Sequence, residues 1–204
     1  MNRSVSILIL SILCLALAAP TIQAAELSGE LMKWHKVTLT FDGPRTSETD
    51  AYNPFLNYRL NVTFTNGDLS YTVPGYYAAD GHAAYTSATS GNKWRVHFAP
   101  SATGTWKWKA SFRMGENVAL DLAPLAGQAC APIDGASGSF RIGKSDKKGR
   151  DHRGKGRLEY VGEHYLRFAD SGEYFIKAGA DAPENLLAFE DFDATPNKGN
   201  RRKA

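Results

Sequence analysis

Three tyrosines between residues 76 and 85 are the side chains best suited to bind a ligand. Tyr76 and Tyr77 are adjacent, and Tyr85 follows within the same Pro- and Gly-rich region. Neighbouring residues of an extended segment point to opposite sides, so the adjacent pair cannot both enter a core. An exposed aromatic ring can cover the apolar face of a pyranose, and we therefore predict polysaccharide contacts at all three. The alternatives are a loop that packs one tyrosine inward, or a loop that docks against another domain.

Two acidic residues form the second candidate group. Asp181 and Glu184 directly follow an apolar run over residues 174–180. At the carboxyl end of a barrel strand such side chains face the active site, so both are candidate substrate-binding residues. The alternative is a helix start, in which the aspartate caps the backbone and the glutamate three residues later reaches back. The two roles are equally favoured in a complete protein, and the capping role is favoured where the rest of a substrate site is missing.

Other reactive side chains do not form a pattern that supports catalysis. The five histidines lack metal-ligand spacing, and Cys130 has no neighbouring cysteine or histidine, so we predict no metal and no cofactor. No phosphate loop or nucleophile elbow is present, and we assign no catalytic residue. Cys14 lies in the leader described below, which leaves Cys130 without an intramolecular partner. We predict a buried, inert thiol.

The elements that must position these residues are strands. Apolar and polar residues alternate over 37–41, 58–64, 94–98 and 106–112, which is typical of strands with one buried face. Turn residues separate them at 66–68, 74–75, 80–81, 90–92 and 100–104, and 139–142 is the last strand. The pattern predicts an all-β, immunoglobulin-like antiparallel β-sandwich over residues 26–142. Trp94, Trp106 and Trp108 share their faces with apolar residues, which favours core packing over sugar binding.

The pattern changes after residue 142. Residues 143–157 are rich in Gly, Lys, Arg and Asp, which indicates a basic linker or exposed connector. Residues 158–161 and 165–168 predict a small hairpin around Gly162. The continuous apolar run 174–180 predicts a strand buried on both faces, as in a parallel sheet. Residues 158–204 would then be a short, incomplete α/β segment, too small to fold alone, and we expect that the chain either stops early or is a fragment of something larger.

The N-terminus predicts export. Arg3 precedes an apolar run over residues 7–19 that is too short to span a bilayer, and small residues surround Ala24. We predict a Sec-type signal peptide, residues 1–24, and a secreted or periplasmic protein with no membrane contact after cleavage. An uncleaved anchor and a lipoprotein lipidated at Cys14 are the weaker alternatives. The formal net charge of +3 does not suggest a nucleic-acid partner.

Several ordered motifs resemble one known family, called domain of unknown function 5060. They are Asn53-Pro54-Phe55, Val73 to Gly81 (VPGYYAADG), Gly91-Asn92-Lys93-Trp94 and Gly104-Thr105-Trp106, within residues 30–142. The resemblance implies an immunoglobulin-like domain at the N-terminus of secreted bacterial proteins similar to glycoside hydrolases. Residues 155–158 and 174–193 look like the opening of the (β/α)₈ (TIM) barrel that follows in such proteins.

The resemblance also limits the expected activity. A barrel needs roughly 250 residues, so residues 158–204 would be a truncated start, without the paired catalytic carboxylates of later strands. We therefore expect an accessory domain that docks against a catalytic barrel in full-length relatives and contacts polysaccharide, inactive by itself. A stand-alone carbohydrate-binding module and a structural spacer remain the alternatives.

Overall fold

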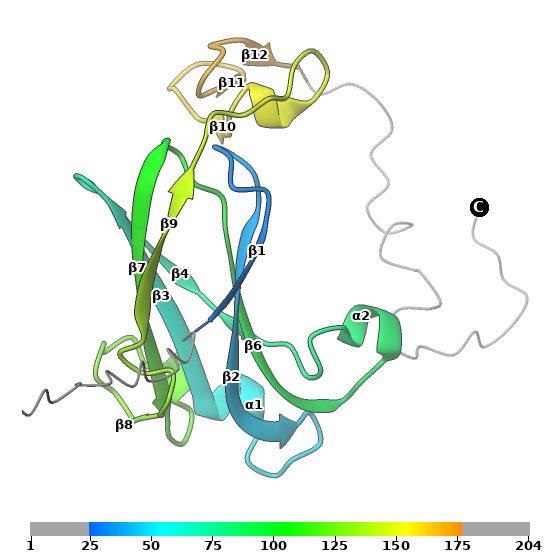
Figure 1. Cartoon of the computed structure of the whole chain (residues 1–204), viewed down its shortest axis with the longest axis vertical. Coiled ribbons are helices and arrows are strands. Elements are labelled where there is room, and N and C mark those ends of the chain that lie inside the picture. Colours follow the sequence, from blue (N-terminus) through cyan, green and yellow to red (C-terminus); the bar gives the residue numbers. More distant parts are fainter. Residues whose placement is uncertain (1–24, 177–204) are drawn as a thin grey trace, which may run out of the picture.

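The computed structural model describes residues 25–176, which form mostly antiparallel strands (Figure 1). The predicted signal peptide, residues 1–24, and the candidate residues Asp181 and Glu184 lie outside the described residues. The helical segments in the described part are α1 (Pro54–Asn57), α2 (Ala83–Thr86), η1 (Val118–Leu120) and η2 (His152–Gly154). None of them is long and apolar enough to cross a membrane. The predicted all-β class is confirmed.

The first sheet contains four antiparallel strands. In spatial order they are β1 (Glu26–Gly29), β2 (Val37–Ser47), β6 (Ser90–Phe98) and β5 (Tyr76–Tyr77). Cross-strand partners such as Leu39 and Val96 point to the same face and are fully buried there. The strands predicted at 37–41 and 94–98 are therefore confirmed, because their alternation matches the two-residue period of the pleat.

The second sheet is built around a long central strand. Its members are β4 (Leu69–Pro74), β3 (Tyr58–Asn66), β7 (Gly104–Met114), β8 (Gln128–Ala129) and β9 (Ser137–Ile142). β3 lies on one side of β7, whereas β8 and β9 pair with different parts of its other edge. The predicted turn at 66–68 joins β3 to β4, and Gly67 adopts φ +57° there, a conformation that favours glycine. The other predicted sandwich strands are confirmed.

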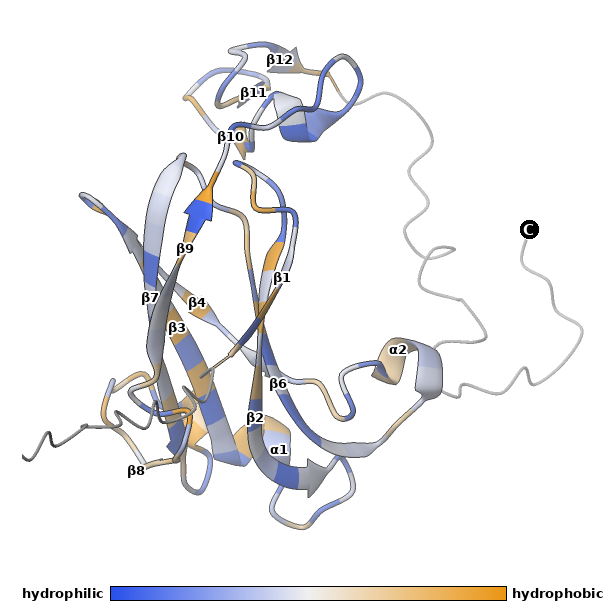
Figure 2. Cartoon of the chain, viewed as in Figure 1, coloured by the Kyte–Doolittle hydropathy of each residue, from blue (hydrophilic) through white to orange (hydrophobic). Residues whose placement is uncertain are grey.

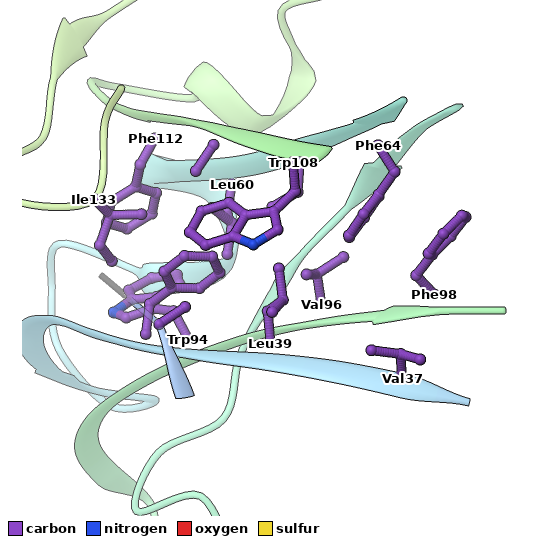
Figure 3. Packing of buried hydrophobic residues seen from close by; sticks show 14 of the residues in the cluster. Val37, Leu39, Leu60, Phe64, Trp94, Val96, Phe98, Trp108, Phe112 and Ile133 are labelled. Atoms are coloured by element: carbon purple, nitrogen blue, oxygen red, sulfur yellow. The ribbon is translucent and has the colours of Figure 1, made fainter. Parts of the chain in front are cut away.

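The two sheets pack face to face around a shared aromatic core (Figures 1 and 3). Phe64 of the second sheet stacks on Phe98 of the first with ring centroids 4.2 Å apart, and Trp94 lies 4.8 Å from Phe112. Trp94, Trp106 and Trp108 are at most 7% exposed, so the predicted core role of the tryptophans is confirmed. Burying an aromatic side chain of this size contributes about 1.5–3 kcal/mol.

Residues 90–92 are strand and not the turn that the sequence predicts. They form the first residues of β6, and Gly91 pairs with Thr46 of β2. A Cβ at Gly91 would lie 2.0 Å from the carbonyl oxygen of Ala79. The glycine is therefore needed because another backbone segment passes close to the strand, rather than because the chain turns.

A small three-stranded sheet follows the sandwich. It consists of β10 (Leu158–Glu159), β11 (Leu166–Phe168) and β12 (Tyr174–Phe175), all antiparallel. The predicted hairpin around Gly162 is confirmed. The described part of the run 174–180 is not a doubly buried parallel strand, because β12 pairs antiparallel with β11 and leaves Tyr174 and Ile176 more than half exposed. Few apolar residues of the described chain cover this small sheet: Phe168 packs against Phe175 and His152.

Candidate functional site

A groove of about 470 Å³ opens beside α1. Figure 1 shows α1 at one end of the two packed sheets. The groove lies between β5 of the first sheet and the first half of β3 in the second sheet, and α1 and the loop after η1 also contribute to its lining. Aromatic rings and a few polar groups line it, among them Phe55, Tyr58, Arg59, Asn61, Tyr76 and Asp121. Clefts with apolar walls and a small number of placed polar groups are the usual form of small-ligand sites.

Helix α1 places Phe55 at the mouth of the groove. The Asn53 side chain accepts a hydrogen bond from the Phe55 backbone N–H (2.8 Å), and Pro54 occupies the first helical position, where no N–H is required. The Phe55 ring is 53% exposed and meets the Tyr77 ring edge-on, with centroids 6.1 Å apart. The groove therefore presents an accessible aromatic surface on a short, capped element.

Tyr76 also lines the groove and is 43% exposed. Its hydroxyl is hydrogen-bonded to Nε2 of His97 (2.9 Å), and Nδ1 of His97 is hydrogen-bonded to the Thr38 hydroxyl (2.9 Å). Partial burial of the His97 ring, with Lys36 and Arg95 nearby, lowers the pKa of His97. The lowered pKa favours the neutral imidazole as the hydrogen-bond partner of the Tyr76 hydroxyl.

Tyr77 points inward, which corrects its prediction as a surface residue. It is 7% exposed, its ring lies 5.1 Å from that of Trp94, and its hydroxyl donates to the carbonyl oxygens of Thr46 and Gly91. Burial raises the pKa of this phenol. The two adjacent tyrosines belong to a strand, and β5 directs one ring to the core and the other to solvent. Tyr77 contributes to the inner wall of the groove and to its stability.

Arg59 fixes the loop that closes one side of the groove. Its guanidinium donates to the backbone carbonyl oxygens of Asp121, Ala123 (2.8 Å) and Pro124 (3.1 Å). Leu122 of that loop is 93% exposed and lines the groove. Because the cation is bound to backbone oxygens, Arg59 positions this wall rather than offering a free charge to a ligand.

The structure separates the sequence-predicted residues. Tyr76 and Tyr77 lie at the groove, whereas Tyr85 lies on α2, is 93% exposed and does not line it. The sequence reasoning missed Phe55 and Asn61 as groove residues. The sequence feature that could have identified Phe55 is the preceding Asn53-Pro54 pair. Such a pair is typical of the start of a helix as well as of a turn.

The groove can bind but offers little for hydrolysis. Among the described residues that line it, Asp121 is the only carboxylate, whereas glycoside hydrolysis uses a pair. Within residues 25–176, no group of His, Cys, Asp or Glu is arranged to hold a metal ion.

Cys130 is buried, as predicted, and does not line the groove. Burial raises the pKa of its thiol.

Part of the chain is similar to a known sequence family. Residues 30–113 match the model of Domain of unknown function (DUF5060). The DUF5060 match ends within β7, so the groove-lining α1, β3 and β5 lie inside it and β8 and β9 lie outside. No curated protein matches the sequence.

A solved structure resembles the chain weakly. It is a "putative glycoside hydrolase" from Bacteroides vulgatus ATCC 8482, 23% identical, with a TM-score of 0.48. The alignment covers 72% of this chain and 21% of the other protein, so this chain spans about a fifth of that protein's length.

A second cluster ties the sandwich to the segment after it, at the end away from α1 (Figure 1). His35 is 1% exposed, with Nδ1 hydrogen-bonded to the Glu30 carboxylate and Nε2 to the Ser145 hydroxyl (2.9 Å). Lys147 and Arg153 also approach Glu30, at 3.6 and 3.4 Å. The hydrogen bond from His35, followed by the two cations, lowers the pKa of Glu30. The exposed connector predicted at 143–157 is therefore held against the sandwich.

Asp170 makes a further link at this junction. It accepts hydrogen bonds from Trp34 Nε1 (2.6 Å) and Lys33 Nζ (2.8 Å). These contacts join β11 and its turn to the loop between β1 and β2. The junction can fix the orientation of the small sheet relative to the sandwich.

Proposed function

We propose that this chain provides an immunoglobulin-like accessory domain of a carbohydrate-active protein, and that the domain binds a glycan chain in the groove beside Tyr76. The strand order supports the immunoglobulin-like assignment, because four strands ordered β1-β2-β6-β5 face a second sheet with β4-β3-β7-β9 neighbours, and successive strand pairs alternate between the sheets. The family resemblance supports the link to carbohydrate chemistry.

The groove is the observation that carries the proposal. Phe55 and Tyr76 are exposed aromatic residues that line it, and Asn61 adds an amide to the same lining. Aromatic rings contact the C–H faces of a sugar, while the amide and the Tyr76 hydroxyl form hydrogen bonds with its hydroxyl groups. The absence of a second carboxylate among the described groove residues is consistent with binding rather than cleavage.

Affinity gel electrophoresis of the full chain in gels that contain soluble polysaccharides tests this function. We expect retardation that is lost in Phe55→Ala and Tyr76→Ala but kept in Tyr85→Ala. Tyr85 is the matched control, because it is an exposed tyrosine outside the groove. Thermal unfolding of each variant verifies that the fold is intact. Equal loss in the Tyr85 variant, or binding that survives both groove substitutions, would refute the assignment of the groove.

A docking role is the second candidate function, and the junction around Glu30 and Asp170 favours it. Ion pairs and hydrogen bonds there hold the segment after the sandwich in one orientation, as a domain that supports a catalytic barrel would require. Exposed Leu120, Leu122 and Leu125 beside the groove would suit the same role. A chain that binds no polysaccharide but is retained by a separately produced barrel from a full-length relative would establish docking as its main role.

Export is part of the proposal. The predicted signal peptide would deliver the domain to the periplasm or the medium, where large glycans are encountered. N-terminal sequencing of the protein recovered from outside the cytoplasm is expected to begin at Ala25, and an intact Met1 would contradict this.

A further inference from the structure

The outer face of the second sheet has an unusual composition. The outward positions of β3, β4, β7 and β9 are filled by Ser, Thr, Asn, Pro, Lys and Arg, with no carboxylate and no aromatic ring. Polar colouring recurs along β3 and β7 (Figure 2). The outer face of the first sheet differs, because Asp42 in the middle of β2 is there paired with Lys93. No outward strand residue of the second sheet's face would therefore repel an acidic ligand, whereas the lining of the groove includes the carboxylate of Asp121.

Register places the lysines of this face among hydroxyl groups. Lys109 lies between Thr63 on β3 and Ser137 on β9. Two residues along β7, Lys107 lies between Thr65 and Ser139 in the same way. Adjacent strands are about 4.8 Å apart, so each ammonium group stands within reach of hydroxyls on both sides.

The cations of this face are available to a ligand. Lys107, Lys109 and Arg141 are exposed, and no described residue forms an ion pair with them. Arg59 and Arg113, at the end of the face nearest the groove, are instead bound to carbonyl oxygens of the loop after η1. Among the described residues of this face, the first lysine without an ion-pair partner, counted from the groove, is Lys109. It belongs to the outward cross-strand pair that follows the pair containing Asn61, a residue of the groove lining.

The groove opens directly onto this face. Asn61 and Pro74 line the groove and are also outward residues of β3 and β4, paired with each other in register. The next row along the strands contains Lys109, and the row after it Lys107. Four residues of extended strand span about 13 Å, so the distance from Asn61 to the Lys107 row is a few sugar units at most.

We propose that the groove and the outer face of the second sheet form one continuous track for an acidic, uronate-bearing polysaccharide. This inference rests on the proposed glycan-binding function and adds the charge of the ligand and its path. The aromatic rings at the groove hold one sugar, and the chain then runs along β3 and β7. Lys109 and Lys107 contact carboxylates, while the flanking serines and threonines hydrogen-bond to sugar hydroxyls.

The composition of the face favours this ligand over other polyanions. Single-stranded nucleic acid binds through aromatic rings on which bases stack, and this face has none. Three free cations spread over a four-stranded surface match a polymer with about one charge per sugar, rather than the dense charge of a highly sulfated chain. Lysine ammonium groups in water give modest, salt-dependent attraction, which suits a long ligand that contacts several of them at once.

Affinity electrophoresis of the full chain with polygalacturonate, alginate and their methyl esters tests the track, because esterification removes the charge and keeps the backbone. We expect tighter binding of an acid polymer than of its ester, a preference that falls as salt rises. Lys107→Gln/Lys109→Gln should weaken binding of the acid polymer about fivefold and leave binding of the ester unchanged. The control Lys144→Gln/Lys148→Gln removes the same charge from exposed connector positions and should have no effect.

The outcomes separate the track from the groove. Equal binding of acid and ester forms, lost in Tyr76→Ala, would keep the groove function and overturn the track. If Lys144→Gln/Lys148→Gln weakened binding of the acid polymer as much as Lys107→Gln/Lys109→Gln, the effect would come from net charge alone. That result would also overturn the track. Tighter binding of dextran sulfate or single-stranded DNA than of both uronate polymers would refute the proposed ligand class. No binding of any glycan would overturn both proposals.

Discussion

The two adjacent tyrosines of β5 provide a sharp test of the fold and the groove together. Alanine at Tyr77 removes a ring that is 7% exposed and packs against Trp94 and Phe55, whereas alanine at Tyr76 removes a ring that is 43% exposed. The substitutions are chemically identical and one residue apart. Any difference in the free energy of unfolding therefore reports which ring is part of the core.

The structure gives the expected magnitudes. Tyr77→Ala loses a buried aromatic ring and leaves a cavity, which costs about 3–5 kcal/mol. Tyr77→Phe removes only the hydroxyl that donates to the carbonyl oxygens of Thr46 and Gly91, and should cost about 1–2 kcal/mol. Tyr76→Ala removes an exposed ring and one hydrogen bond to His97, and should cost less than about 1 kcal/mol.

Urea unfolding at pH 7, followed by the fluorescence of the buried tryptophans, measures these differences. A loss of 3–5 kcal/mol is about a third or more of the stability of an ordinary domain, and it should lower Tm by about 10 °C. The slope against urea should stay constant across the series, so that a shift in midpoint reports stability alone. Equal costs at the two positions, or a larger cost at Tyr76, would refute the inward placement of Tyr77.

Three further predictions concern other parts of the chain. Gly91→Ala places a Cβ 2.0 Å from a backbone carbonyl oxygen and should cost about 2 kcal/mol or more in a urea titration, whereas Gly143→Ala, whose nearest neighbour is 3.8 Å away, should cost little; comparable losses would contradict the close approach at β6. Cys130 should react with iodoacetamide at least about tenfold more slowly in the folded chain than in urea, measured on its peptide by mass spectrometry, because burial raises its thiol pKa. The hydrogen bond from Arg153 holds the pKa of Asp151 at about 2, so its contribution to stability is present above about pH 4 and is lost as the pH falls toward 2. The difference in Tm between wild type and Asp151→Asn should shrink from pH 5 to pH 2.5, and a constant difference would argue against this ion pair.

Strand alternation is the part of the fold that local sequence determines most directly. Leu39 and Val96 belong to strands that pair far apart in sequence, yet each strand shows its buried face by its own two-residue period. A glycine predicts its local structure less directly than strand alternation does. Gly91, for example, is compatible with a turn and with the close approach of two backbone segments. Only the position of Ala79 in three dimensions separates these cases.

The groove depends on contacts that the sequence does not contain locally. Adjacent tyrosines imply that one ring points inward, but the choice of Tyr77 follows from its register opposite Trp94. Phe55 was missed because an Asn-Pro pair marks both turns and helix starts. The apolar run that begins at Tyr174 predicts a strand correctly, whereas its burial depends on what packs against it.

The register of the first sheet also sets the order in which the domain can fold. Val37 pairs with Phe98, about sixty residues later, and Val62 of the second sheet pairs with Ala110. At about 5–20 residues per second, a nascent chain exposes β2 for roughly 3–12 s before its partner is synthesised. Such non-local pairing gives folding times of about milliseconds to seconds once the strands are present. The edge of β2 that pairs with β6 and the edge of β3 that pairs with β7 therefore stay open for a period, during which a chaperone has time to bind them.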